Sequence, residues 1–580
     1  MDKNTISEIL NQIGVLLELR GENPFKARAF YNASRTILGV SGDIKTMIEN
    51  GEIRKIKGIG ESIAKEIIGL VTTEKSQAYE ELKSSFPEGI FKILQIQGLG
   101  PKRVRILHQK LNITSVEELE QACKEGKLET LDGFGKKTEE NILAGISQLQ
   151  KHSSKFHCST AEESAQKIIE VISHQKGVTR LEIGGSLRRK KEIIGDIDIV
   201  VSAKKSEIKK IMHAFTTHSE VERITGEGET KSSVVLKNGI NCDLRVVDDA
   251  EFPFALNYFT GSKEHNVRMR SLARKLGLSL NEYGFSKIES EEKRGKAKKE
   301  IVCKTEEDIY KALGLQYVPP ELREDMGEIE AAEKNAIPKL LEESEIRGTF
   351  HCHSTYSDGV NTLEEMANAA IALGWEYLGI ADHSKSAAYA RGMNEEQVKK
   401  QQKEIEQLNK KWKNFRIFKG IEVDILPNGN LDFSDAVLSS FDFVVASIHS
   451  SFKMSEADMT KRITKALKNK YVTMLAHPTG RLLLQREGYA VNMHTVIDVA
   501  ADNGKMIEIN AHPYRLDLDW RLCKYAKEKN ILIPINPDAH NIDGLKDVHY
   551  GVGIARKGWL EKKDVFNTRS LKEIEKYLLK

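Results

Sequence analysis

Several features that define other protein classes are scarce in this chain. Its 580 residues include six cysteines, and no two of them form a CxxC pair. This argues against a disulfide framework and a cysteine-type zinc site, and favours a reducing compartment, so a cytoplasmic protein is expected. No apolar run reaches the roughly 18 residues of a membrane helix. The opening residues, MDKNTISEIL, start acidic and become amphipathic, which argues against a signal peptide.

Charge of one sign is also scarce, since the formal net charge is only +3. Overall charge therefore does not indicate a nucleic-acid partner. Two local basic clusters stand out, at 187–191 and 292–299, and the second is interpreted as a solvated surface segment. Histidine is unevenly distributed, with nine of the sixteen after residue 345. The two halves of the chain are therefore expected to carry different chemistry.

Residues 193–201, IIGDIDIVV, form an apolar segment that two acids interrupt. Aspartate is a poor strand former, and burying an unpaired carboxylate is costly. Because residues i and i+2 of a strand share a face, Asp196 and Asp198 would face one ligand site while Ile197 and Ile199 face the core. The pattern predicts a cation site on one face of a strand. An acid pair in a surface strand or turn is the alternative, and the flanking apolar residues argue against it.

Three segments in the first third repeat an apolar residue, a Gly-x-Gly and the start of an amphipathic helix. They are IKGIGESIAKEI (56–67), IQGLGPKRVRIL (96–107) and LDGFGKKTEENI (131–142), and they resemble the helix-hairpin-helix motif. Two glycines permit a tight turn that leaves backbone N–H groups at a helix N-terminus, where a phosphate is favoured. One copy could merely end a helix, but three predict DNA binding that ignores base sequence. The glycines are Gly58, Gly60, Gly98, Gly100, Gly133 and Gly135.

The paired acids follow a small-residue segment, Gly184-Gly185-Ser186. Small residues let the backbone approach a triphosphate, and the serine hydroxyl and Arg189 would add hydrogen-bond donors. Asp243, in the apolar segment GINCDLRVV, is the best candidate for a third acid on a neighbouring strand. Two Mg²⁺ ions held by three carboxylates could activate a 3′-hydroxyl and stabilise a pyrophosphate leaving group. The segment therefore predicts a nucleotidyl-transfer palm.

The motifs G-S-x-R-R, G-D-x-D, D-L-R, YFTGSKEHNVRMR (258–270) and NEYGF (281–285) follow one another in an order that resembles the family X DNA polymerases, of which DNA polymerase beta is the familiar member. The resemblance covers about residues 1–320. It implies that Asp196 and Asp198 bind both catalytic metals, Mg²⁺ or Mn²⁺, and that Asp243 binds the catalytic one. The implied nucleotide contacts are Gly185, Ser186 and Arg189 at the triphosphate, Tyr258, Phe259 and Gly261 against the sugar, Asn266 at the base and Arg270 at the templating position.

One position departs from the repair members of this family. Those members carry a lysine in the first hairpin helix that forms a Schiff base with an abasic sugar, and this chain has Glu66 there, with Ser62 in place of another basic residue. Lys65 is adjacent but would point about 100° away around a helix. A 5′-deoxyribose-phosphate lyase is therefore not expected, unless a shifted helix lets Lys65 substitute.

In the second half, histidines and acids recur at the ends of short apolar runs. The runs lie at 347–359, 378–384, 419–426, 444–452, 474–480 and 533–540. This alternation predicts repeated strand–helix units with ligands at the carboxyl ends of the strands, where barrel active sites form. Histidine and carboxylate ligands without cysteine suit Zn²⁺ or Mn²⁺. A lone histidine is usually structural, but six with several acids predict a polynuclear metal site.

This set resembles the polymerase-and-histidinol-phosphatase (PHP) domain, a distorted seven-stranded barrel with up to three metals. The resemblance implies phosphoester hydrolysis and nine ligands, all present here: His351, His353, Asp358, His383, Glu422, His449, His477, Asp538 and His540. Arg391 and Arg481 each follow a ligand cluster. They could hold a substrate phosphate or be ordinary surface arginines.

The expected fold is multidomain, α+β and α/β. We expect a helical DNA-binding domain (1–85), fingers with two further hairpins (86–150), a nucleotidyltransferase palm (151–248), a thumb (249–320), a linker (321–345) and a distorted (β/α)7 PHP barrel (346–580). The composition of the linker region predicts a Glu/Ala/Lys helix over about 324–345.

A family X polymerase joined to a PHP domain is similar to the bacterial and archaeal PolX enzymes. The resemblance implies a monomeric DNA-directed DNA polymerase that fills short gaps in repair, with gapped or primer-template DNA and dNTPs as partners. It also implies a 3′–5′ exonuclease or 3′-end-processing phosphodiesterase in the PHP domain, with abasic-site cleavage as a further option. Two alternatives remain. One is a PHP nuclease whose polymerase part only positions DNA ends, which the intact Asp triad opposes. The other is a small-molecule nucleotidyltransferase or phosphatase, which the three hairpins oppose.

Overall fold

A computed structural model describes residues 3–38, 40, 44–56, 58–73, 75–96, 98–152, 154–287 and 301–579. The basic cluster at 292–299 lies outside the described residues. The chain divides into two compact units, residues 1–153 with 358–366 and residues 154–357 with 367–580. None of the helices in the described ranges has the length and hydropathy of a membrane span.

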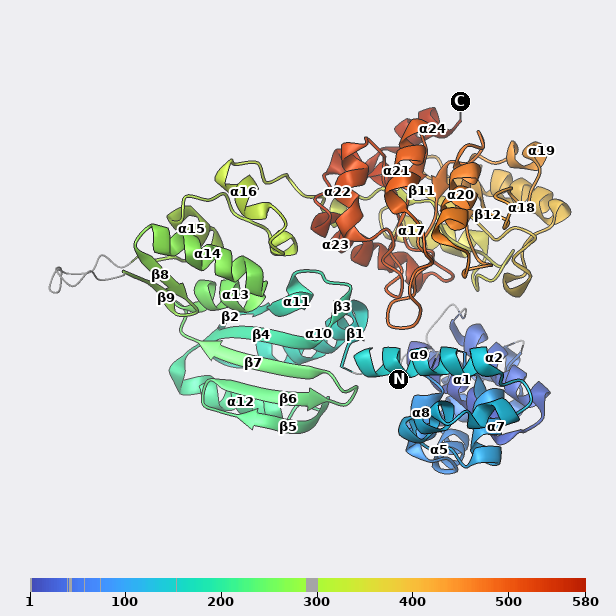
Figure 1. Cartoon of the computed structure of the whole chain (residues 1–580), viewed down its shortest axis with the longest axis horizontal. Coiled ribbons are helices and arrows are strands. Elements are labelled where there is room, and N and C mark those ends of the chain that lie inside the picture. Colours follow the sequence, from blue (N-terminus) through green and yellow to red (C-terminus); the bar gives the residue numbers. More distant parts are fainter. Residues whose placement is uncertain are drawn as a thin grey trace. The chain divides into compact units, whose positions relative to one another are not determined.

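The first unit is helical (Figure 1). Its first helix packs on its neighbours through Ile6, Leu10, Ile13 and Leu17, which are fully buried and spaced to fall on one helical face. The elements of this unit are α1 (Lys3–Arg20), α2 (Pro24–Leu38), α3 (Ile44–Glu49), η1 (Ile53–Lys55), α4 (Glu61–Thr73), α5 (Gln77–Ser84), α6 (Glu88–Ile93), α7 (Pro101–Leu111), α8 (Val116–Lys124), η2 (Lys127–Thr130) and α9 (Lys136–His152).

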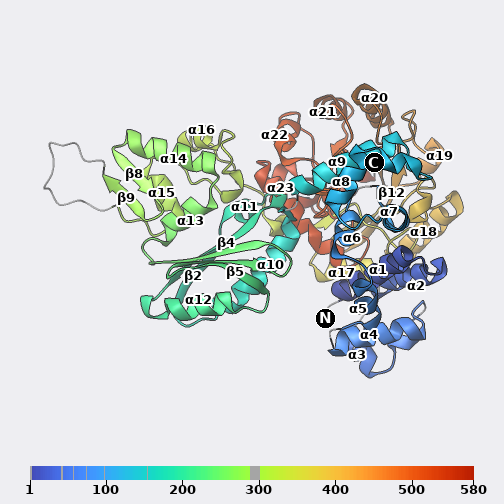
Figure 2. The same ribbon diagram turned by 60° about the horizontal axis from the view of Figure 1, so that its bottom comes forward.

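The second unit begins with a five-stranded sheet in the order β2-β4-β7-β6-β5. The central pair β4 and β7 is parallel and the other pairs are antiparallel. Helices α10 and α12 cover one face of this sheet and α13 the other (Figure 2). The elements are β1 (Phe156–His157), α10 (Cys158–Ser173), β2 (Val178–Ile183), α11 (Gly185–Arg188), β3 (Ile193–Ile194), β4 (Asp196–Ala203), η3 (Lys205–Glu207), α12 (Ile208–Thr216), β5 (Val221–Glu227), β6 (Lys231–Leu236) and β7 (Asn241–Val247).

The next segment packs on this sheet as a small helical subdomain with a two-stranded hairpin. Its own core centres on Met269, Ile309 and Tyr310, which are fully buried. The elements are α13 (Phe252–Thr260), α14 (Lys263–Lys275), β8 (Leu278–Asn281), β9 (Gly284–Lys287), α15 (Glu306–Ala312) and η5 (Pro320–Leu322).

The helix predicted over about 324–345 is wrong in extent. The structure has only α16 (Glu328–Glu333) and the single turn η6 (Glu343–Glu345) there. Gly327, in the left-handed region with φ +97°, starts α16. Pro338 cannot continue a helix because its ring removes the backbone donor and clashes with the preceding turn. Leu340 and Leu341 are buried, so this linker packs rather than spans.

The C-terminal part is a curled parallel sheet in the order β10-β11-β12-β13-β14-β15, followed by the parallel pair β16-β17. A bridge between Cys352 and Ala539 brings the segment after β17 beside the segment after β10. The predicted distorted barrel is confirmed in this form. The strands are β10 (Gly348–Thr349), β11 (Tyr377–Ile380), β12 (Arg416–Asp424), β13 (Phe443–Ser447), β14 (Met474–Leu475), β15 (Met506–Ile507), β16 (Ile509–Asn510) and β17 (Ile535–Asn536).

Helices surround this curled sheet (Figure 1). They are α17 (Leu363–Ala372), η7 (Ala388–Ala390), α18 (Glu395–Leu408), α19 (Asp435–Leu438), α20 (Glu456–Leu467), α21 (Met493–Asp502), α22 (Trp520–Glu528), η8 (Asp543–Asp547), α23 (Val548–Lys557), η9 (Lys562–Asp564), η10 (Phe566–Thr568) and α24 (Leu571–Leu578).

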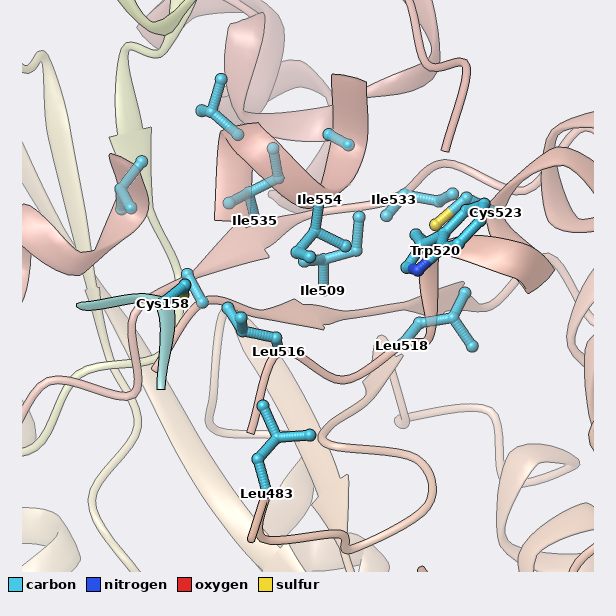
Figure 3. Close-up of a cluster of buried hydrophobic side chains, with 14 of the residues drawn as sticks. Cys158, Leu483, Ile509, Leu516, Leu518, Trp520, Cys523, Ile533, Ile535 and Ile554 are labelled. Atoms are coloured by element: carbon cyan, nitrogen blue, oxygen red, sulfur yellow. The ribbon is translucent and has the colours of Figure 1, made fainter. Parts of the chain in front are cut away.

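The sheet regions of the second unit share one apolar core. Figure 3 shows Cys158, from the start of α10, beside Leu516, with Ile509 and Ile535 of the C-terminal sheet in the same cluster. The imidazole of His157 bonds the carbonyl of Leu483 across the same junction, at 2.9 Å. The N-terminal end of α10 is therefore packed against the C-terminal barrel.

Candidate functional site

The three Gly-x-Gly segments adopt the same turn. In each, the residue between the glycines donates its N–H to a carbonyl three residues earlier, and a helix begins directly after the second glycine. The first glycine of each turn has a positive φ: +95° at Gly58, +88° at Gly98 and +81° at Gly133. A Cβ added to Gly60, Gly100 or Gly135 would meet nothing within 4 Å, so these helix starts are open. The arrangement fits backbone amides offered to a phosphate.

The two acids of the fourth strand alternate with core residues as the sequence predicts. Ile197 and Ile199 are buried under α10 and α12, whereas Asp196 is exposed and Asp198 half-buried on the other face. Asp198 lies directly opposite Asp243 in the parallel β4–β7 register. The third acid therefore comes from the neighbouring strand, and all three carboxylates lie at one edge of the sheet.

Gly184 and Gly185 place backbone against these acids. Gly184 donates its N–H to the carbonyl of Asp198 at 2.8 Å. Gly185 has φ +62°, and a Cβ on it would lie 2.5 Å from Asp198 Oδ2. Any side chain at this position would therefore collide with the carboxylate, so glycine is needed for both its space and its backbone conformation.

The negative charges of the three carboxylates at this edge are only partly balanced by nearby cations. Burial first, then the neighbours Asp196 and Asp243, raise the pKa of Asp198 to about 7. Lys231 lies 2.6 Å from Asp243 and supplies one compensating charge. Within the described residues, the three acids do not form one of the groups whose ligand atoms all lie within 4.8 Å. A carboxylate whose pKa is raised by like charges favours cation binding, which fits divalent metals here.

The other predicted nucleotide contacts lie on or beside α11, α13 and α14, and some of them form hydrogen bonds within the protein. Tyr258 and Phe259 lie in the last turn of α13 with their rings edge to face and the ring centroids 5.1 Å apart. Asn266 donates its side-chain amide to the Tyr258 carbonyl at 2.7 Å. Arg270 is exposed on α14, and Ser186 is half-buried on α11. Gly261 follows α13 with φ +71°.

Arg189 is held on two sides. Its Nε donates to Glu324 at 2.9 Å and its Nη1 to the carbonyl of Thr260 at 2.5 Å. A Cβ on Gly261 would lie 3.0 Å from the same Nη1, so the arginine lies close against the turn after α13. The guanidinium is therefore fixed between α11 and the predicted sugar-binding turn.

In the C-terminal barrel, eight of the nine predicted ligands form three overlapping groups. In each group the ligand atoms lie within 4.8 Å of one another. His477 joins them through a 3.0 Å contact between its Nε2 and Glu422 Oε1. The groups are His353 with Asp358, His383 and His540; His351 with His353 and Asp538; and His383 with Glu422 and His449. Three groups that share members fit a polynuclear metal centre.

Some of these ligands are already in forms that bind cations. Burial, followed by the neighbouring His540 and His383, lowers the pKa of His353 to about 3, which leaves the ring neutral. Burial would raise the pKa of Glu422, but the surrounding histidines hold it well below the usual range. Despite burial, neighbouring carboxylates raise the pKa of His351 well above its usual range and that of His449 to about 9, so these two rings would release a proton when a metal binds. His351 Nε2 and Glu422 Oε2 are buried and form no hydrogen bond within the described chain. Buried imidazole and carboxylate atoms without hydrogen bonds fit metal coordination.

A second set of carboxylates orients these ligands, and sequence reasoning missed it. Glu508, at the break between β15 and β16, bonds His351 Nδ1 at 2.8 Å and accepts from Asn536. Asp424 bonds His449 Nδ1 at 3.1 Å. Such partners fix the ring orientation of metal-binding histidines. Glu508 carried a usable signal, because MIEIN is an apolar strand interrupted by one acid, as at Asp198.

The two arginines that the sequence singled out lie in different surroundings. Arg481 is mostly buried and committed to Asp519 and to the carbonyls of Arg515 and Leu516, so it is a structural residue. Arg391 is exposed just after η7. Arg515, which the sequence did not single out, has its Nε 3.6 Å from Asp538 Oδ2. Its contact with the Asp538 carboxylate is favourable, and a guanidinium beside the predicted metal ligands could also bind an anionic substrate.

Comparisons with known proteins cover the whole chain. The helix-hairpin-helix domain matches residues 1–76, the SAM-like helix-hairpin-helix tandem 91–147, the DNA polymerase beta thumb 255–324 and the PHP domain 349–512. The DNA polymerase/3′-5′ exonuclease PolX of Bacillus subtilis (strain 168) is 38% identical over 580 residues, which cover 100% of this chain and 99% of that protein. The chain belongs to the PolX family.

Other matches are partial. Probable phosphatases of Thermoanaerobacter sp. (strain X514) and Acetivibrio thermocellus are 28% and 30% identical. They cover 39% and 33% of this chain, and 92% and 78% of those proteins. A Leishmania infantum polymerase beta in a ternary complex aligns at 24% identity over 41% of this chain and 100% of that one. Its TM-score of 0.26 does not establish a shared fold.

PolX membership confirms the predicted combination of helix-hairpin-helix, polymerase-type and PHP domains. Both catalytic regions imply divalent metal ions. The domain boundaries drawn from the sequence and the roles of individual residues stay predictions.

Proposed function

We propose that this PolX chain is a DNA-directed DNA polymerase that fills short gaps from dNTPs and removes nucleotides from 3′ ends in its PHP pocket. One observation carries the polymerase proposal. Asp196, Asp198 and Asp243 lie together on two neighbouring strands, and the turn at Gly185 packs so closely against Asp198 that no other residue would fit there. Three acids beside exposed backbone suit a metal–triphosphate ligand. Both metal sites and all three hairpins lie on one chain, so a monomer would suffice.

In the palm, we assign Asp196, Asp198 and Asp243 to two ions, Mg²⁺ or Mn²⁺. When bound, such ions lower the pKa of an attacking hydroxyl and offset charge on the phosphoryl oxygens. The protein would orient the nucleotide, with Gly185 and Ser186 along the triphosphate and Tyr258 and Phe259 against the sugar. The Nη2 group of Arg189 forms no hydrogen bond within the described residues, so it is available to a phosphate oxygen.

In the PHP pocket, we assign the nine histidines and acids to two or three ions, Zn²⁺ or Mn²⁺. The neutral His353 ring and the ionised Glu422 support this choice, because both offer lone pairs without losing a proton. Arg515 would hold the scissile phosphate against the site, a role that the sequence left open for Arg391 and Arg481. A 3′ terminal phosphodiester would then be aligned for attack by water.

Gapped DNA is the proposed macromolecular substrate because three equivalent turns offer backbone amides to phosphates. A lyase step at an abasic sugar is not part of the proposal. Glu66, at the position of the family's lysine, accepts hydrogen bonds from Ser76 Oγ at 2.6 Å and from the Ala78 N–H at 3.2 Å. It holds the first turn of α5, while Lys65 is exposed on a different side of α4.

The polymerase proposal is tested by gap filling on a labelled gapped duplex with dNTPs and Mg²⁺ or Mn²⁺. We expect extension by the wild type and loss of extension in Asp198→Ala. Glu222→Ala, an exposed acid on β5 of the same sheet, is the matched control and should extend normally. Unchanged extension by Asp198→Ala would refute the palm assignment. Rapid shortening without any extension by the wild type would favour the nuclease alternative.

The PHP proposal is tested by 3′ shortening of the same labelled strand without dNTPs. We expect His353→Ala to abolish shortening. His494→Ala, an exposed histidine on α21 of the same domain, should leave it intact. Shortening that persists in His353→Ala would place the hydrolytic site elsewhere.

A further inference from the structure

Helix α23 of the PHP domain presents one stripe of residues to the palm. His549, Gly553 and Lys557 are four residues apart and therefore share a helical face. A Cβ at Gly553 would lie 3.3 Å from the side chain of Lys190, so the small residue permits close approach. His549 lies 3.4 Å from the Lys190 ammonium and 3.1 Å from Glu162 of α10. The stripe therefore covers the residues that follow α11.

Lys557 is the most deeply placed residue of this stripe. Its side chain is fully buried, and its ammonium lies over the ring of Trp520 at 4.6 Å. It donates to Glu324 Oε1 at 2.6 Å, to the Arg189 carbonyl at 3.1 Å and to the Glu321 carbonyl at 3.2 Å. An ammonium has three protons, so these three acceptors satisfy it completely. Burial of this charge is costly, and it lowers the pKa of Lys557 to about 8 despite Glu324.

The contacts of Lys557 converge on Arg189. The ammonium bonds the Arg189 backbone, and through Glu324 it bonds the Arg189 side chain, since Glu324 Oε1 also accepts from Arg189 Nε at 2.9 Å. Arg189 and Glu324 are each 11% exposed, so water screens these charges little. Arg189 caps the four-residue helix α11, which begins at the Gly185 contact with Asp198. Displacing this end of α11 would therefore move both Arg189 and the glycine turn.

We propose that Lys557, a residue of the nuclease domain, is a positioning residue for the polymerase site: it holds α11 and, through Glu324, aims Arg189 at the triphosphate of the incoming nucleotide. The inference rests on the proposed polymerase function. The PHP domain thus has a second role, independent of its metals: it holds Arg189 and α11 in the position that binds the dNTP. A buried lysine that served PHP chemistry alone would not need all three of its acceptors to come from the palm and the linker.

The test is steady-state gap filling by the full chain, with KM for dNTP, kcat and 3′ shortening measured for each variant. Lys557→Met keeps the stem length and removes the ammonium. Glu324→Gln removes only the negative charge that joins Lys557 to Arg189. Because Glu324 is closer to solvent, this variant is the second test if Lys557→Met folds poorly. Both should raise KM for dNTP by about tenfold, since a hydrogen bond to a charged group has been lost, with a smaller change in kcat. Shortening should be unchanged.

Two comparisons separate a positioning role of Lys557 from a general loss of protein stability. Lys527→Met is the matched control, because Lys527 is also ion-paired, to Glu561 and Asp564, but within the PHP domain. It should alter neither KM nor kcat. In an Arg189→Ala background, Lys557→Met should raise KM less than it does in the wild type, because the part of its effect that passes through the arginine side chain is already lost, whereas the bond of Lys557 to the backbone of residue 189 remains.

The inference is overturned if Lys557→Met and Glu324→Gln both keep KM for dNTP within about twofold of wild type. It is also overturned if Lys527→Met raises KM equally, or if the effect of Lys557→Met is undiminished in Arg189→Ala. A wild type that extends no primer would instead refute the proposed polymerase function, so the two failures are distinguishable.

Discussion

Acids inside apolar strands mark both metal sites at the residue scale. Asp198 faces Asp243 across the β4–β7 pair, and Glu508 lies at the break between β15 and β16 with His351 on its carboxylate. Asp198 has two further acids beside it, which add to the cost of its burial unless a cation binds, whereas Glu508 is paired with the His351 ring. The same sequence signal therefore indicates a ligand in the palm and an orienting partner in the PHP pocket.

Gly185→Ala should abolish most nucleotide incorporation. The added Cβ would lie 2.5 Å from Asp198 Oδ2 at a backbone φ of +62°. Either the carboxylate or the turn must move, and a shift of about 1 Å in a reacting geometry can lower the rate on the order of a hundredfold. Gap filling by Gly185→Ala measures this. Gly226→Ala on β5, where a Cβ would meet only ordinary contacts at 3.7 Å, is the control. Normal incorporation by Gly185→Ala would contradict the close approach.

Glu508→Gln should weaken metal binding in the PHP pocket without unfolding the barrel. Glutamine can keep the hydrogen bond from Asn536, but it lacks the negative charge that holds the His351 ring in place. Burial lowers the pKa of His351, and the charge of Glu508 raises it. Loss of such a partner typically costs 10–100-fold in metal affinity or activity. Metal titration followed by 3′ shortening measures it, with Asp498→Asn on α21, a half-buried carboxylate that pairs with Lys529, as control. Equal metal affinity in Glu508→Gln and wild type would exclude an orienting role.

At the element scale, the three hairpin turns repeat one backbone conformation rather than one set of side chains. In each, the second glycine directly precedes a helix, and a Cβ added to that glycine would meet nothing within 4 Å. A DNA backbone bound this way would be recognised by position and charge, not by base sequence.

Gly98→Ala should therefore weaken binding to gapped duplex severalfold at low salt. Alanine at φ +88° costs roughly 1–2 kcal/mol and distorts the turn. Gly126→Ala is a matched control in the same unit, since Gly126 also has a positive φ, +68°, with nothing within 4 Å, but lies outside the hairpins. Fluorescence anisotropy measures the affinity for the gapped duplex, and thermal melting measures the loss of stability that the strained turn causes. Equal affinities for the two variants at equal melting temperatures would remove the hairpin from DNA binding.

Periodicity and local motifs were enough to predict the hairpin turns, the DxD strand and the histidines and acids that gather at strand ends, because neighbouring residues set these features. The metal-binding roles of those residues stay predictions. Features set by distant residues were not predictable. Arg481 precedes its partner Asp519 by 38 residues, and nothing local distinguishes it from Arg515. The helix expected over about 324–345 failed because Pro338 and burial of Leu341 outweigh helix propensity. Lys557 and Arg189 are 368 residues apart, so their contact was invisible to the sequence.

At the scale of the whole molecule, the palm and the PHP barrel of the second unit share an apolar core, and charged residues pair across the contact between them. Apolar packing around Cys158 and Ile509 joins them, as Figure 3 shows, and the stripe on α23 adds polar contacts. A junction built this way should respond to pH through its titratable members.

His549→Gln should lower the melting temperature in a pH-dependent way. Hydrogen bonds to Glu162 and Glu343 raise the pKa of His549 from 6.5 to about 9, although Lys190 opposes this. A raised histidine pKa stabilises the fold fully below pH 6.5, and that contribution is lost as pH rises through about 9. The melting gap between wild type and His549→Gln should close over this window. His494→Gln, on the exposed face of α21, should show no such window. A gap that is constant with pH would contradict the assignment.

The central claim is that two independent metal sites act in opposite directions on one DNA end. The most direct test follows a single labelled 3′ end in a gapped duplex, with and without dNTPs, for the wild type, Asp198→Ala and His353→Ala. We predict that Asp198→Ala shortens the strand but never extends it, and that His353→Ala extends it but never shortens it. Loss of both activities in either variant, or of neither, would contradict the account.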